Sequence, residues 1–84
     1  MYVYAIEINN MEPCSDDYYH YVLEDVYADK NTAVKMLENR GFKPVNDHLY
    51  VWQPTKKESY DNAPFIYTEC GVEANIVKCE VHLS

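Results

Sequence analysis

The chain has 84 residues and a formal net charge of −7, from 14 Asp and Glu against 7 Lys and Arg. This length predicts one domain over residues 1–84, because two separate cores would each fall below the usual minimum of about 50 residues. The acidic balance excludes free nucleic acid as a direct ligand, and no apolar run approaches the roughly 18 residues of a membrane span. With no secretory signal in the sequence, we expect a cytoplasmic protein whose three cysteines stay reduced.

The first third of the sequence predicts two strands joined by a loop. Tyr2–Ile8 alternates aromatic and β-branched residues with a period of two, which is typical of a strand. Residues 9–17 contain proline and turn formers and therefore predict a loop. A second strand is expected over Tyr18–Tyr27, with either a bulge near Glu24–Asp25 or two apolar faces to explain its imperfect alternation.

The next segment predicts a short helix. Asp29 is a suitable N-cap, and Arg40 falls in the last turn. Apolar residues recur at helical spacing, at Ala33, Met36 and Leu37. Gly41 then ends the helix in the left-handed conformation, and we expect Phe42 to fold back and seal the helix against a sheet.

Three short strands are expected after the helix, at His48–Gln53, Pro64–Cys70 and Val72–Leu83. The predicted order is β-β-α-β-β-β, an α+β fold in which a single antiparallel sheet of about four to five strands carries one helix on one face. The other face would be open to water or to a partner. In this arrangement Cys79 could serve as a small core residue.

The strand that begins at His48 allows two arrangements. His48, Tyr50 and Trp52 could form an aromatic row on the outer face of the sheet, with Leu49 and Val51 directed to the core. Alternatively, Trp52 plugs the edge of the sheet beneath the polar loop that follows it.

Charge is distributed unevenly along the chain. Residues 1–29 contain seven acids and six of the nine tyrosines but no Lys or Arg, whereas the rest contains seven acids and seven bases. Carboxylates pair with Lys and Arg, and Tyr offers rigid contact area, so this segment predicts a surface for a basic partner. The other interpretation is a solvated acidic face with the tyrosines in the core. The residues expected to bind the partner are Glu12, Asp16, Asp17, Tyr18, Tyr19, Glu24 and Asp25.

The sequence predicts no catalytic site, cofactor or metal site. It has only two glycines, so it lacks a glycine-rich loop for phosphates or an oxyanion. Cys14, Asp16, Asp17 and His20 lie close together, but the second ligand pair that is usual in zinc sites is missing. We expect these four to be chance neighbours in a surface loop and the protein not to be an enzyme.

Three segments, Val26–Phe42, His48–Trp52 and Ala74–Leu83, resemble small accessory proteins of phages and mobile elements in Gram-positive bacteria. The shared pattern is a hairpin, a helix that begins D/S-K-x-x-A and ends in Gly-Phe, and a closing I-x-x-C/V-E segment. The resemblance implies a fold and a context. Proteins of this size and acidity in phage genomes often block host machinery, and anti-CRISPR proteins that occupy the basic groove of an effector nuclease are one such group.

Together these features predict a non-catalytic, phage-type inhibitor that acts in the host cytosol. It would bind a basic, nucleic-acid-handling host protein, such as a CRISPR effector nuclease, as a nucleic-acid mimic or a steric blocker. The alternative is a small homodimeric regulatory module that binds a ligand such as a nucleotide signal, with its open sheet face paired with a second copy.

Overall fold

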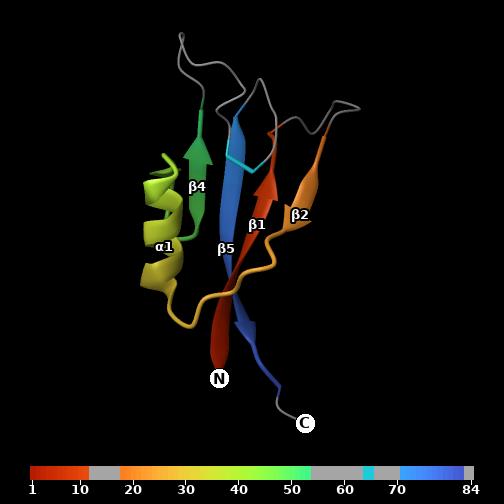
Figure 1. Ribbon diagram of the computed structural model, residues 1–84, viewed down its shortest axis with the longest axis vertical. Coiled ribbons are helices and arrows are strands. Elements are labelled where there is room, and N and C mark those ends of the chain that lie inside the picture. The colour runs from red at the N-terminus through yellow and green to blue at the C-terminus, as the bar shows by residue number, and fades with distance from the viewer. Residues whose placement is uncertain (12–17, 54–63, 66–70, 83–84) are drawn as a thin grey trace.

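The computed structural model describes residues 1–11, 18–53, 64–65 and 71–82, which form one antiparallel sheet and one helix (Figure 1). The sheet order is β2-β1-β5-β4-β3. The elements are β1 (Tyr2–Asn9), β2 (His20–Val22), α1 (Lys30–Asn39), β3 (Lys43–Pro44), β4 (Leu49–Trp52) and β5 (Val72–Glu80). The α+β class and the predicted element order are therefore confirmed.

The N-terminus of α1 is capped as predicted. Asp29 has extended backbone angles, and its Oδ1 accepts the N–H groups of Asn31 at 2.8 Å and Thr32 at 3.3 Å. The Thr32 hydroxyl donates to Asp29 Oδ2 at 3.0 Å. This side-chain hydrogen bond, with those of the backbone, lowers the pKa of the Asp29 carboxyl, because each favours its charged form.

The C-terminus of α1 is closed by a Schellman motif. Gly41 has a φ of +92°, which only glycine adopts at little cost, and its N–H donates to the Glu38 carbonyl. The Phe42 N–H donates to the Leu37 carbonyl at 3.0 Å, and the Phe42 side chain is buried. The predicted seal of the helix against the sheet is confirmed.

The core lies between α1 and one face of the sheet. Opposite residues of antiparallel strands share a face, so the pairs Ile6–Ile76 and Ile8–Ala74 bring two rows of apolar side chains under the helix. The fully buried apolar residues are Ile6, Ile8, Ala33, Leu37, Val72 and Ala74. Within the described ranges no element covers the opposite face of the sheet.

Of the two arrangements considered for the strand at His48, the aromatic row on the outer face of the sheet is not formed. Tyr50 and Trp52 are buried in the core under α1, and Leu49 and Val51 lie on the uncovered face. Both sets of side chains on β4 are apolar, so alternation alone does not decide which set faces inward. The larger rings fill the space beside the Schellman turn, where Trp52 lies close to Gly41.

Several other boundaries differ from the prediction. The second strand is only His20–Val22, and β5 ends at Glu80. The short strand β3 was not predicted. Its Pro44 is tolerated because β3 is an edge strand. Of the strand expected at Pro64–Cys70, the first two residues form a bend and the others lie outside the described residues. Cys79 is half-exposed on the uncovered face, not in the core.

Candidate functional site

The segment that follows β2 leaves the sheet ladder and then returns to it. The pairing passes from Glu7–Val22 to Tyr4–Tyr27, which is three positions along β1 but five along the other segment. Two extra residues are therefore accommodated between Val22 and Tyr27. Of the two explanations considered for the imperfect alternation of residues 18–27, the register change supports the bulge near Glu24–Asp25.

The bulge is anchored at both ends. The Leu23 N–H donates to the Ile6 carbonyl at 2.9 Å, and the Leu23 side chain packs against the core. Tyr27 and Tyr4 exchange two backbone hydrogen bonds of 2.9 and 2.8 Å. Glu24 and Asp25 lie between these anchors and are exposed, so the backbone holds two adjacent carboxylates at the surface.

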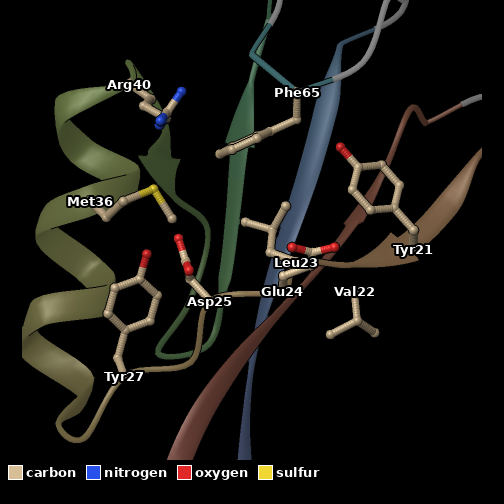
Figure 2. A pocket seen from close by; sticks show the side chains of 9 residues that line it. All are labelled: Tyr21, Val22, Leu23, Glu24, Asp25, Tyr27, Met36, Arg40 and Phe65. Atoms are coloured by element: carbon tan, nitrogen blue, oxygen red, sulfur yellow. The ribbon is translucent and has the colours of Figure 1, made fainter.

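These carboxylates border a cleft of about 440 Å³ between α1 and the bulge (Figure 2). Its lining residues are Tyr21, Val22, Leu23, Glu24, Asp25, Tyr27, Met36, Arg40 and Phe65. In Figure 2 the Asp25 carboxylate and the Tyr27 hydroxyl point toward Met36 of α1, whereas the Val22 side chain points away from the helix. Glu24 and Asp25 are adjacent in the sequence, yet both line one cleft because they lie beyond the end of β2.

The cleft has a net negative charge. Glu24 and Asp25 form no salt bridge with any residue in the described part of the chain. Among the described residues that line the cleft, the one cation is Arg40, whose guanidinium lies 4.7 Å from the centroid of the Phe65 ring. The geometry shows that an aromatic ring at this end of the cleft accommodates a guanidinium, while the two carboxylates remain available to a cation from outside.

The tyrosines of the cleft supply polar groups on apolar rings. Burial raises the pKa of the Tyr21 phenol above its ordinary value of 10.0, so its hydroxyl remains a neutral donor and acceptor at physiological pH. Tyr21 and Tyr27 are half-buried and pack against the core. Their rings are consequently held in place before any partner binds, which lowers the entropic cost of recognition.

Four of the seven predicted partner-binding residues lie on this side of the described structure. Glu24 and Asp25 are exposed at the cleft, and Tyr18 and Tyr19 remain 40% and 60% exposed beside β2. The backbone of Tyr19 is fixed by buried Asn10, whose Oδ1 accepts the Tyr19 N–H at 3.1 Å. The other three residues, Glu12, Asp16 and Asp17, lie outside the described residues.

Two further acids of the first third have partners of their own. Glu7 contacts His20 on the uncovered face, with 3.3 Å between Glu7 Oε2 and His20 Nε2, and Asp29 caps α1. No three of the described His, Cys, Asp and Glu side chains are grouped so that they could hold a metal ion. Cys14, Asp16 and Asp17, considered earlier with His20, lie outside the described residues.

Sequence reasoning missed the residues that form the walls of the cleft. Met36 and Arg40 were assigned to the helix, and Phe65 lies far from both in the sequence. Tyr21 and Tyr27 belong to the Tyr-rich first third but were not selected. The helical spacing from Met36 to Arg40 indicates that the two share a face, but nothing in the sequence shows that this face borders the bulge.

No family model matches this chain, and neither a curated protein nor a solved structure shows significant similarity to it. Within the described ranges, α1 is too short and too polar to cross a membrane.

Proposed function

We propose that this chain is a non-catalytic binding protein that blocks a basic, nucleic-acid-handling protein. Its binding surface is the acidic, Tyr-rich surface, defined as residues 18–27 and the cleft between them and α1. The observation that carries the proposal is the pair of exposed carboxylates at Glu24 and Asp25, which have no salt-bridge partner in the described structure and border a cleft with tyrosine walls.

The cleft matches the chemistry of an arginine or lysine side chain. A guanidinium can receive charge-assisted hydrogen bonds from a carboxylate while its plane stacks on an aromatic ring. Arg40 over the Phe65 ring already makes the second of these contacts within the chain. A partner residue that enters beside Glu24 and Asp25 would find both, and Tyr and Arg are enriched among the residues that dominate binding energies.

A partner that handles nucleic acid presents such cations in clusters, because it must neutralise phosphates. Seven acids without a base in residues 1–29 create a negative field that would accelerate encounter with such a surface. The partner is proposed to be a host enzyme such as a CRISPR effector nuclease, in line with the phage context that the sequence resemblance implies. Bound there, the protein would act as a nucleic-acid mimic or a steric blocker.

The cleft gives less support to the alternative of a nucleotide-binding module. Phosphates would meet the two carboxylates of Glu24 and Asp25, and the one cation among the described lining residues, Arg40, is already placed over Phe65. Like-charge repulsion at this range outweighs what one arginine could add. A cationic protein side chain is therefore the better match.

The test has two steps: capture of the partner from a lysate, and then a binding measurement with the purified partner. The tagged protein is used as bait in a bacterial lysate, proteins that elute with rising salt are identified, and the purified partner is titrated by calorimetry. Glu24→Lys with Asp25→Lys should weaken binding by at least about tenfold, because two charge-assisted contacts are reversed. Binding should also weaken steeply as the salt concentration rises.

Glu38→Lys with Asp47→Lys is the matched control. It makes the same change in net charge at exposed positions that do not line the cleft, and it should leave most of the affinity intact. Equal affinity in the cleft variant and the wild type, with a cooperative unfolding transition in both, would refute the proposal. Equal weakening by both double variants would show that net charge, and not the cleft, governs binding.

A further inference from the structure

The outer edge of β5 is unpaired over its last part. β5 pairs with β1 over residues 73–80 but with β4 only over residues 72–75. Among the described residues, the last backbone hydrogen bond on the β4 side is the Ile76 N–H donating to the His48 carbonyl at 2.7 Å. Figure 1 shows β1 and β5 continuing as a two-stranded ribbon past the ends of β4 and α1. Within the described ranges no strand lies beside residues 77–80 on this edge.

The alternation of the backbone shows which groups are unpaired. Ile76 directs its N–H away from β1, so Lys78 and Glu80, at the same parity, also direct their N–H and C=O groups to the outer edge. No described group bonds to either N–H. The edge therefore presents two donors and two acceptors at the spacing of an antiparallel ladder.

The residues on the two sides of Cys79 match one another. A valine lies two positions away on each side, and the adjacent residues are a lysine and a glutamate of opposite charge. The sequence reads Val77-Lys78-Cys79-Glu80-Val81. Lys78 and Glu80 are exposed on the helix face of the sheet, while Val77, Cys79 and Val81 are half-exposed on the uncovered face. A strand with this pattern is complementary to itself when it is reversed.

We propose that a second copy of this chain pairs with this edge, antiparallel, with Cys79 opposite Cys79 on a two-fold axis. Lys78 then lies opposite the partner's Glu80, and the two residues exchange both backbone hydrogen bonds; the symmetric pair does the same. On the uncovered face, Val77 lies opposite Val81 of the partner subunit and the two Cys79 side chains meet at the axis.

Charge selects this register over its neighbours. A shift that centres the axis on Lys78 or Glu80 places like charges directly opposite one another, which is destabilising in a cross-strand pair. A shift of the partner strand by one residue would place Lys78 opposite an odd-numbered residue. The N–H and C=O groups of that residue point toward β1, so the two strands could not form hydrogen bonds. Of these registers, the axis at Cys79 satisfies the hydrogen bonds and both charges.

A hollow on the helix face adds to the complementarity. A depression of about 260 Å³ beside this edge is lined by Tyr4, Lys30, His48, Ile76 and Lys78, and thus carries two lysines and a histidine in an acidic protein. The partner's Glu80 would project onto this same face, opposite Lys78. The acidic side chain thereby approaches a basic concavity.

The pairing joins the two sheets and leaves the acidic, Tyr-rich surfaces at the far ends. In the strand order β2-β1-β5-β4-β3, that surface lies beside β2, on the opposite side of β5 from the edge proposed to pair. A dimer would therefore display two copies of that surface, and two linked sites increase apparent affinity for a repetitive partner. The dimer does not depend on the proposed function.

The association is tested by sedimentation equilibrium of the full chain over a range of concentrations. The wild type should show a monomer–dimer equilibrium. Lys78→Glu, which places a carboxylate opposite the partner's Glu80 twice in each dimer, should raise the dissociation constant by about tenfold or more. Lys78→Glu combined with Glu80→Lys should restore the dimer, because the reversed charges are again complementary.

Lys35→Glu is the matched control, since it changes the net charge equally at an exposed position of α1 and should leave the dissociation constant nearly unchanged. A monomer at all concentrations would overturn the proposal and indicate that Lys78 and Glu80 protect the edge from pairing. A dimer that Lys78→Glu leaves intact would also overturn it and indicate association through the uncovered sheet face.

The register is tested separately by cross-linking in a Cys14→Ser, Cys70→Ser background, where Cys79 is the remaining thiol. Opposite residues in an antiparallel pair have Cα atoms about 4.5–5.5 Å apart, within the range of a disulfide. Diamide, which takes up the two electrons and two protons of two Cys79 thiols, should produce a covalent dimer. A non-covalent dimer that diamide fails to cross-link would refute this register.

Discussion

The part of the sheet beneath α1 and the edge that carries β2 differ in how tightly they are packed. Beneath α1, Leu37 and Val72 are fully buried, and the rings of Tyr50 and Trp52 fill the remaining space. At the β2 edge, Val22 of β2 and Tyr19, which precedes β2, have half or more of their surfaces exposed. One side buries apolar residues, and the other displays acids and tyrosines.

This difference separates the residues that stabilise the fold from those proposed to bind a partner. The helix side supplies most of the burial, so it must keep its shape, whereas the bulge after Val22 is held by backbone hydrogen bonds and a few half-buried side chains. Exposed carboxylates that repel one another are tolerated there because the core does not depend on them. Substitutions on the two sides should therefore have different consequences.

The largest effect is expected for truncation of the core. Leu37→Ala should lower the free energy of unfolding by about 2–5 kcal/mol, because it removes a fully buried side chain and leaves a cavity between α1 and the sheet. Val22→Ala, on the exposed side, should change it by less than about 0.5 kcal/mol. Urea denaturation measures the free energy of unfolding of both variants. Equal losses would contradict the inference that stability depends mainly on the part of the sheet beneath α1.

A second prediction concerns the two glycines that adjoin Trp52. Gly71→Ala should cost about 1–3 kcal/mol, because φ is +113° and the added Cβ would lie 2.6 Å from the Trp52 carbonyl oxygen. Gly41→Ala should cost less, although φ is +92°, because its Cβ would meet the Trp52 ring at 3.2 Å and a side chain can shift. Thermal unfolding of both variants measures the two losses of stability. A larger loss for Gly41→Ala than for Gly71→Ala would show that the packing around the Trp52 ring is less able to adjust than inferred.

The smallest effect is expected at the cap of α1. The pKa of Asp29 is lowered by its hydrogen bonds, so its charged form stabilises the native state above the ordinary pKa of an aspartate. This contribution should disappear as the pH falls through the lowered pKa of the folded protein. Asp29→Asn should keep the cap and lose this pH dependence, whereas Asp29→Ala should lose both.

The measurement is the free energy of unfolding of wild type, Asp29→Asn and Asp29→Ala from neutral to acidic pH. If wild type and Asp29→Asn lose stability in parallel as the pH falls, the carboxylate of Asp29 has no part in the pH dependence, and other carboxyl groups cause it.

Elements whose signals are local could be predicted from the sequence. The alternation of Tyr2–Ile8, the cap at Asp29 and the terminator at Gly41 each act over a few residues, so they predicted β1, both ends of α1 and the α+β class. The concentration of acids before residue 30 likewise indicated which segment carries the charged surface.

Which faces are buried, and which residues contact one another, depends on how the elements pack together. β4 is apolar on both faces, so the choice of Tyr50 and Trp52 for the core depends on the volume to be filled beneath α1. The cleft joins Met36 and Arg40 of the helix to the bulge after β2, and Phe65 comes from a third segment. Contacts between segments far apart in the chain depend on packing and strand order, and local patterns contain no information about either.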